Sequence, residues 1–248
     1  MQLRGEALMD PTGFEASIER LDGLADVWAA MVRFAQGRGV RRLGYHHLPP
    51  PSAPDAGLLR IENDGFGDAL LAQYLAARAA GLAVLAASAL KDVQPIYLDE
   101  LEARTDLSPR ERAHLAGYRA AGVDNGLAFS VYGPNGRNGL LAVELSAPTR
   151  LPAGELGALR WAGQAMHLRY CNLLIPQLGT PPSLSEREAE VLAWVARGKS
   201  NASIAAILGI SAHTVDAHLR RIYLKLGVVD RISAALRGLG FGLIRLDA

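Results

Sequence analysis

Little in the sequence could cross-link the chain or hold it in a membrane. Its 248 residues include one cysteine, Cys171, so neither an internal disulfide nor a zinc site with several cysteines can form. No stretch without Asp, Glu, Lys or Arg exceeds 16 residues, which is too short to span a bilayer. The first ten residues carry charges where a signal peptide needs an apolar stretch. We therefore expect a soluble protein of the reducing cytoplasm, with no membrane partner.

Neither sign of charge dominates the chain, whose formal net charge is +1. The charge is nevertheless uneven. Residues 181–248 hold nine Lys or Arg against six Asp or Glu, a net charge of +3, which leaves −2 for residues 1–180. Half of all residues are hydrophobic and 21% are charged, as in a globular protein. This pattern favours a small basic module that follows a neutral or slightly acidic one.

The length predicts two domains, at about 150 residues per domain. The segment Gly-Thr-Pro-Pro-Ser at 179–183 is the best candidate linker, because proline cannot continue a helix and the glycine can end one. We therefore expect a first domain at 1–178 and a second at 184–248. Another proline-rich stretch, 49–54, lies between two strand-like runs and is predicted to be a loop within the first domain.

The first domain is predicted to contain both helices and strands. Ser108 and Glu111 have the spacing of a capping box, which predicts a helix start. Apolar runs at 126–132 and 139–145, joined by a Gly-Pro-Asn-Gly turn, predict a hairpin. Further helices are expected at 24–36, at 67–89 with a possible break at Gly81, and at 152–174, and further strands at 42–48 and 58–62.

The long helix expected at 152–174 carries apolar residues at alternating spacings of three and four. Such a seam packs either on the sheet of its own domain or on a second copy of the chain. The second alternative makes this helix a candidate dimer contact, through Leu156, Leu159, Met166, Tyr170 and Leu173. The last helix of the chain, expected from Asp230, is the other candidate.

The second domain is predicted to consist of four short helices. Ser185 with Glu188 forms a capping box, and Ser200, Ser211 and Asp230 are the next helix starts. The first three helices are predicted to end at glycines, Gly198, Gly209 and Gly227. Two helices, a tight glycine turn and a longer capped helix are typical of a helix-turn-helix domain.

The third of these helices has the pattern of a DNA-reading helix. At about 100° per residue, Val215, Leu219, Ile222 and Leu226 fall on one stripe that must face the core. The opposite face is left for a major groove, which admits one helix. There Arg220 or Arg221 can contact guanine, Ala217 a thymine methyl, and Asp216 either a cytosine amino group or a neighbouring arginine. The candidate DNA-binding residues are Ser200, Asn201, His213, Thr214, Asp216, Ala217, His218, Arg220, Arg221, Lys225 and Arg231.

The segments 184–192, 196–201, 204–211, 214–219 and 225–228 together resemble the LuxR-type DNA-binding domain almost without interruption. The resemblance implies that Asp216, Ala217 and Arg220 reach bases, although Asp216 departs from the basic residue often found there. It also implies a homodimer that binds an inverted repeat in double-stranded DNA.

The upstream region resembles the autoinducer-binding domain of quorum-sensing regulators, which holds an acyl-homoserine lactone between a sheet and helices. The resemblance implies an α+β chain, with an α/β/α sandwich followed by an all-α four-helix domain. Tyr74 matches the family tyrosine that binds the acyl carbonyl of the ligand, and Gly126 matches the family glycine. Leu70, Ala83 and Leu98 replace a tryptophan, the aspartate that accepts from the ligand amide, and a second tryptophan. The candidate pocket residues are Phe66, Leu70, Tyr74, Ala83, Val84, Leu98, Gly126 and Ser130.

These departures predict that the chain does not bind acyl-homoserine lactones in the family's usual way. Each unpaired buried polar group costs about 1–3 kcal/mol, so two or three lost partners lower the affinity about 100-fold or more. The cavity is then either filled by apolar side chains or open to a different, more apolar small ligand. Two alternatives remain open: a lactone-responsive regulator with a modified pocket, and a regulator that pairs with another regulator and titrates it away from DNA.

No other chemistry is indicated by the sequence. His46 and His47 are adjacent on a predicted strand, so they point to opposite faces and cannot share a metal from one side. His167 and Cys171 are four apart on a helix and are read as a packed thiol beside a solvated histidine. No nucleophile, base and orienting group occur together, so we expect no enzyme, no metal and no cofactor.

Overall fold

The computed structural model describes residues 9–51, 53–92 and 94–245. The chain divides into two compact units. Unit 1 comprises Met1–His47, Leu59–Tyr132 and Asn138–Leu173, and unit 2 comprises Leu48–Leu58, Gly133–Arg137 and Leu174–Ala248.

Unit 1 is built on a five-stranded sheet with the strand order β2-β1-β5-β4-β3. The strands are β1 (Val40–Leu48), β2 (Ile61–Asp64), β3 (Ile96–Tyr97), β4 (Gly126–Tyr132) and β5 (Asn138–Leu145). The predicted hairpin is confirmed, since β4 and β5 pair antiparallel from Gly126 opposite Glu144 to Tyr132 opposite Asn138. The strand expected at 58–62 begins three residues later, at Ile61.

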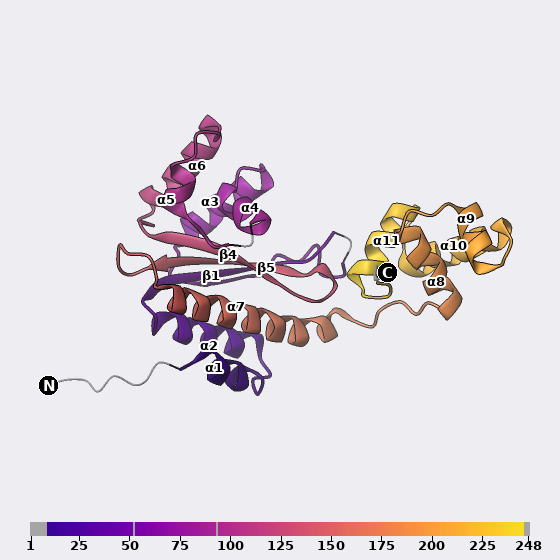
Figure 1. Ribbon diagram of the computed structural model, residues 1–248, viewed down its shortest axis with the longest axis horizontal. Coiled ribbons are helices and arrows are strands. Elements are labelled where there is room, and N and C mark those ends of the chain that lie inside the picture. The colour runs from indigo at the N-terminus through magenta and orange to yellow at the C-terminus, as the bar shows by residue number, and fades with distance from the viewer. Residues whose placement is uncertain (1–8, 52, 93, 246–248) are drawn as a thin grey trace. The chain divides into compact units, whose positions relative to one another are not determined.

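Helices cover both faces of this sheet (Figure 1). On one face lie α1 (Pro11–Ile18), α2 (Leu24–Gln36) and α7 (Ala153–Leu174). On the other lie α3 (Asp68–Ala79), α4 (Val84–Lys91), α5 (Leu98–Glu102) and α6 (Pro109–Ala120). The predicted α/β/α sandwich is therefore confirmed. The helix expected at 67–89 is two helices, because the chain turns at Gly81 with φ +71°, which favours glycine.

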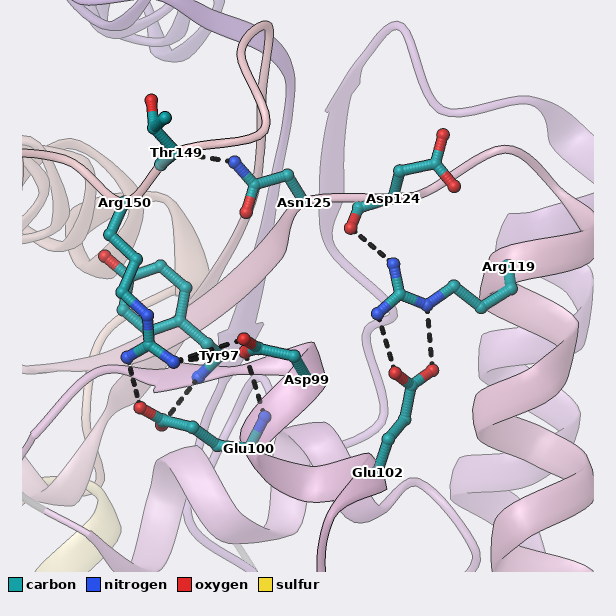
Figure 2. Close-up of polar contacts among 9 residues, drawn as sticks. All are labelled: Tyr97, Asp99, Glu100, Glu102, Arg119, Asp124, Asn125, Thr149 and Arg150. Carbon is teal, nitrogen blue, oxygen red and sulfur yellow. Dashed lines mark hydrogen bonds and ion pairs between the residues drawn. The ribbon is translucent and has the colours of Figure 1, made fainter.

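Arginines hold the short edge strand β3 and the segments around it (Figure 2). Arg119 of α6 donates to both carboxylate oxygens of Glu102 at 2.9 and 2.6 Å, and to the carbonyl of Asp124. Arg150 pairs with Asp99 and Glu100 and lies over the ring of Tyr97, 4.2 Å from its centroid. Through these contacts Arg119 links α6 to α5, and Arg150 links α5 and Tyr97 of β3 to the segment that follows β5.

Unit 2 contains the four predicted helices, α8 (Glu186–Ala196), α9 (Asn201–Leu208), α10 (Ala212–Leu226) and α11 (Arg231–Gly240). Two short 3₁₀ helices, η1 (Pro134–Gly136) and η2 (Ile175–Leu178), also belong to it. Its core includes Val191, Leu192, Ile204, Val215 and Ile222, all fully buried.

The proline-rich loop belongs to unit 2, not to the first domain as the sequence indicated. The reason is a buried ion pair. Arg137 donates two hydrogen bonds to Asp55, at 2.8 and 3.1 Å, and a third to the carbonyl of Gly240 at 2.9 Å. Gly240 lies directly against Ala53, because a Cβ there would stand 2.9 Å from the Ala53 Cα. The loop is therefore held at the end of α11 by partners that are distant in sequence.

No single helix in the described part of the chain is both long and apolar enough to cross a membrane. Two pairs of consecutive helices reach that length and hydropathy when they are taken together. The chain bends by 65° between α3 and α4 and by 108° between α9 and α10.

Candidate DNA-binding helix and candidate ligand cavity

The ends and the inner face of α10 follow the sequence prediction. Ser211 is the N-cap and accepts a hydrogen bond from the Thr214 backbone N–H at 3.0 Å. Gly227 ends the helix in the left-handed conformation, with φ +63°. The predicted stripe is confirmed, since Val215, Leu219, Ile222 and Leu226 are all buried in the core of unit 2. The opposite face of α10 carries exposed side chains, among them Arg220 at 76% and Leu224 at 83%.

Arg220 is more exposed than Arg221, its neighbour on α10. The accessible fraction of the side chain is 76% for Arg220 and 57% for Arg221. The Arg220 Nη2 donates to Asp216 Oδ2 at 2.7 Å, one helical turn away. The sequence left two roles open for Asp216, and the structure has it bound to a neighbouring arginine. The carboxylate holds the guanidinium on the exposed face of the helix.

Arg221 and Lys225 have a different environment because both face Glu188 of α8. Lys225 Nζ donates to Glu188 Oε2 at 2.6 Å, and Arg221 Nε lies 3.6 Å from Oε1. Arg221 also contacts His218 Nδ1 at 3.0 Å. Of the two arginines that the sequence offered for guanine, Arg220 is the one not tied to the core.

Glu188 is almost fully buried and joins α8 to α10. Its carboxylate also accepts from the Ser185 backbone N–H at 2.8 Å, which confirms the predicted capping box. Burial acts to raise the pKa of Glu188, but the hydrogen bonds from Lys225 and Ser185 outweigh it and hold the pKa below its usual range. The cap is a local interaction and was predicted from the sequence, whereas the two basic partners were not, because only the tertiary fold brings them together.

The other candidate phosphate contacts lie at helix starts. Ser200 caps α9 by accepting from the Ser203 backbone N–H at 3.2 Å, and Asn201 is the first residue of that helix. The Thr214 hydroxyl shares a hydrogen bond with Ser211 at 2.8 Å. Arg231, the first residue of α11, donates to the Lys199 carbonyl at 2.6 Å. Amide groups at helix N-termini are suited to phosphate. The remaining candidates, His213 and His218, lie on α10.

Unit 1 contains an apolar cavity of about 90 Å³, partly open, between the sheet and its helices. Of the eight residues expected there, five line it: Phe66, Leu70, Tyr74, Leu98 and Gly126. Among the described residues the lining does not include the other three. Ala83 and Val84 are buried where α4 begins, and the Ser130 hydroxyl donates to the Ala89 carbonyl at 2.5 Å.

One polar pair in the cavity was missed by the sequence analysis. His46 Nδ1 is hydrogen bonded to the Tyr74 hydroxyl at 2.7 Å, and both residues line the cavity. Burial lowers the pKa of His46 to about 4, and the charges of Arg78 and His47 act in the same direction. The ring is therefore neutral near pH 7. The sequence offered one signal for this position. Neighbouring residues of a strand point to opposite faces, so one of His46 and His47 had to face the cavity side of the sheet.

The cavity is small for a signalling molecule. An apolar cavity of about 150 Å³ holds benzene, and common ligand pockets measure about 300–1,000 Å³. A volume of about 90 Å³ therefore takes a small apolar group unless side chains move.

The apolar seam of α7 was expected to pack either on its own domain or on a second copy of the chain. Leu159, Met166 and Tyr170 are fully buried within the chain. The seam packs on its own unit, and the structure contradicts a dimer contact through these three residues. Leu156 and Leu173 are partly buried. Two large apolar side chains on α7 are exposed instead, Trp161 at 52% and Leu168 at 42%, seven residues apart and so on one face.

Both parts of the chain match known protein families. Residues 182–237 match the model described as bacterial regulatory proteins, luxR family. Residues 23–170 match the model of the autoinducer binding domain.

Curated relatives include the transcriptional activator protein AhyR of Aeromonas hydrophila, which is 29% identical over 164 residues, 63% of this chain and 62% of that protein. The transcriptional activator protein SolR of Ralstonia solanacearum is 37% identical over 133 residues, 51% of this chain and 56% of that protein. The chain thus matches less than two thirds of the length of these relatives.

The fold is also found in solved structures. A crystal structure of Escherichia coli SdiA has a TM-score of 0.70 at 19% identity and covers 94% of this chain and 97% of SdiA. SdiA in complex with octanoyl-rac-glycerol has a TM-score of 0.66 at 20% identity, with 94% of each chain covered. At this identity the likeness shows the fold alone, and it confirms the α+β class with a C-terminal helical domain.

Proposed function

Because the chain belongs to the LuxR family of bacterial regulatory proteins, we propose that it is a sequence-specific DNA-binding transcription regulator acting as a homodimer in the cytoplasm. The observation that carries the proposal is the exposed face of α10. There Arg220 is held by Asp216 outside the core, on a helix whose other face is fully used for packing.

In the proposed complex α10 lies in the major groove. Arg220 makes a two-pronged contact to guanine, Ala217 packs against a thymine methyl, and Asp216 orients the arginine. Ser200, Thr214 and Arg231, at the starts of three helices, contact phosphates and set the affinity and its salt dependence rather than the sequence. Two copies read half-sites about 34 Å apart on an inverted repeat.

The proposed dimer uses exposed apolar faces. On α7 these are Trp161 and Leu168. On α11, Ile232 and Leu236 are exposed and four apart, and Val229 precedes them with 91% of its surface accessible. Apolar side chains at such spacing on a helix suit a second copy of the same helix.

We propose that the chain does not bind acyl-homoserine lactones in the way its family usually does. The small cavity supports this, as does Leu70, which lines it where the family carries a lactone-binding tryptophan. The proposed occupant is a small apolar ligand with one polar group, which the His46–Tyr74 pair can meet. The SdiA complex with octanoyl-rac-glycerol is consistent with a ligand of another class in the same fold.

The test is a DNA selection with full-length protein made in a host without acyl-homoserine lactones. Recovery of an inverted repeat supports a regulator competent without that ligand. Weak, salt-sensitive and sequence-blind binding contradicts the proposal and favours a missing ligand or partner. If the protein instead titrates another regulator, Arg220→Ala leaves its cellular effect intact, whereas a DNA regulator loses its effect.

A thermal-stability panel of acyl-homoserine lactones at saturating dose tests the ligand part separately. No shift agrees with the proposal. A clear rise in the melting temperature with any lactone restores the alternative of a lactone-responsive regulator.

A further inference from the structure

A second buried polar cluster lies on the face of β1 opposite the cavity. His47 of β1 and His167 and Cys171 of α7 are each 1% exposed or less. The sequence analysis expected a solvated His167, and the structure contradicts this because the ring is enclosed between α7 and the sheet. One ligand atom from each of the three residues lies within 4.8 Å of the other two.

Two of these atoms have the spacing of ligands to a shared ion. His167 Nε2 and Cys171 Sγ are 3.7 Å apart. Metal bonds of about 2.3 Å to sulfur and about 2.0–2.1 Å to nitrogen place two ligand atoms about 3.6 Å apart in tetrahedral and about 3.8 Å apart in trigonal geometry. The two groups are four residues apart on α7, so the helix itself sets this distance.

Tyr45 orients the histidines. Its hydroxyl is hydrogen bonded to His167 Nδ1 at 2.7 Å and to His47 Nδ1 at 3.3 Å. Metal-binding histidines commonly have their other ring nitrogen held by such a partner, which sets the tautomer and the ring orientation. For His167 the arrangement leaves Nε2 directed at the cysteine sulfur.

Gly139 of β5 provides the space that the cluster occupies. A Cβ at this position would stand 2.7 Å from the Tyr45 ring and 2.9 Å from His167 Nδ1. A larger residue at position 139 would therefore displace His167 and the tyrosine that holds it.

We propose that His47, His167 and Cys171 bind one Cu(I) ion inside unit 1. Thiolate and imidazole are the ligands that select Cu(I) and Zn²⁺ over Mg²⁺ or Ca²⁺. Charge then favours Cu(I), because a thiolate, two neutral imidazoles and Cu⁺ give a neutral site. Zn²⁺ would leave a net positive charge in a buried site and lack its usual fourth ligand.

Binding replaces the thiol proton, which passes to solvent, and involves no change of oxidation state. The ion connects the sheet to α7 and stabilises unit 1 by mass action. This inference does not depend on the proposed DNA binding.

The test is a competition titration of the full-length protein, under anaerobic conditions, with Cu(I) presented by a chromogenic bidentate chelator. One equivalent should transfer to the protein, with sulfur and nitrogen ligands in the copper X-ray absorption spectrum. Cys171→Ser and His167→Gln should each abolish transfer. Tyr45→Phe keeps all three ligands and removes only the orienting hydroxyl, so it should weaken binding about 10–100-fold.

His114→Gln is the matched control, because His114 is also a buried histidine of unit 1 but lies on α6. It should bind copper as the parent does. Circular dichroism and melting curves without metal establish that each variant is folded. If a ligand variant does not fold, the parent stoichiometry and Tyr45→Phe still decide the matter. Failure of the parent to take Cu(I) from the chelator overturns the proposal, as does preferential binding of Zn²⁺ or equal binding by a folded Cys171→Ser variant. The cluster is then a hydrogen-bonded core network only.

Discussion

Asp216 and Arg220 are joined by a hydrogen bond of 2.7 Å across one turn of α10, on the face that points away from the core. An acidic side chain on a DNA-reading helix repels phosphate, but here its charge is partly matched by the arginine that it holds. In the proposed complex the pair couples affinity to sequence, because the guanidinium leaves the carboxylate only for a base edge that accepts two hydrogen bonds.

Asp216→Ala is predicted to separate affinity from specificity. Loss of the carboxylate removes phosphate repulsion and frees Arg220, so binding to unrelated DNA should tighten several-fold. The ratio of selected to scrambled duplex affinity should fall, since a mismatched contact is worth about 1–3 kcal/mol. Fluorescence anisotropy with both duplexes measures the ratio. An unchanged ratio would mean that Asp216 does not direct the arginine.

Glu188→Gln is predicted to destabilise unit 2 by about 1–3 kcal/mol at neutral pH, because a charged acceptor for Lys225 is lost. The pKa of Glu188 is lowered in the fold, so its contribution is present above the unfolded pKa and disappears as the pH falls through the folded value. Urea unfolding at pH 7 and at an acidic pH below the folded pKa should therefore show a large difference between parent and variant only at pH 7. An equal difference at both pH values contradicts the ionic role.

His46 is predicted to make unit 1 sensitive to mild acid. Its folded pKa of about 4 lies below the ordinary value of 6.5, so the unfolded chain binds the extra proton first. Stability should fall by up to about 3 kcal/mol as the pH drops from about 6.5 to about 4. His46→Gln should flatten this part of the profile, measured by thermal melts across pH. Equal slopes for parent and variant would rule His46 out as the cause.

Gly139→Ala is predicted to destabilise unit 1 by about 1–3 kcal/mol through overpacking. The new methyl group meets Tyr45, Val131 and His167, each within 3 Å. Gly154→Ala is the control, because a Cβ there meets nothing within 4 Å. The two melting temperatures are compared with that of the parent. If the melting temperature of Gly139→Ala equals that of the parent, the added methyl group fits without overpacking, which would contradict the prediction.

Trp161→Glu is predicted to weaken self-association. Trp161 is exposed on α7, and a charge in an apolar contact opposes pairing. Sedimentation velocity across a concentration series measures the shift from dimer to monomer. Leu224→Glu provides a matched control on exposed apolar surface, because Leu224 lies on α10 and outside both proposed dimer faces. Identical association of parent and Trp161→Glu would remove α7 from the dimer contact.

The helical domain could be predicted almost to the residue because its signals are local. Ser185, Ser200 and Ser211 cap the helices they were expected to cap, and glycines end them. These interactions span three or four residues, so the sequence contains both partners side by side.

The contacts missed by the sequence analysis join residues that are far apart along the chain. Glu188 and Lys225 are 37 residues apart, Tyr45 and His167 are 122, and Asp55 and Arg137 are 82. No periodicity reports such a pairing. The pair of Asp55 and Arg137 explains why the proline-rich loop belongs to unit 2. The pair of Tyr45 and His167 explains why this histidine is buried, although the sequence predicted a solvated one.

The most direct test of the central claim is the affinity of Arg220→Ala for the selected inverted repeat, compared with the parent and with Arg110→Ala, an exposed arginine of α6. Arg220→Ala should lose about 5- to 150-fold in affinity, corresponding to about 1–3 kcal/mol, with relaxed preference at one base pair of each half-site. Arg110→Ala should bind as the parent does. Unchanged affinity and unchanged base preference in Arg220→Ala would contradict the claim that this face of α10 reads DNA.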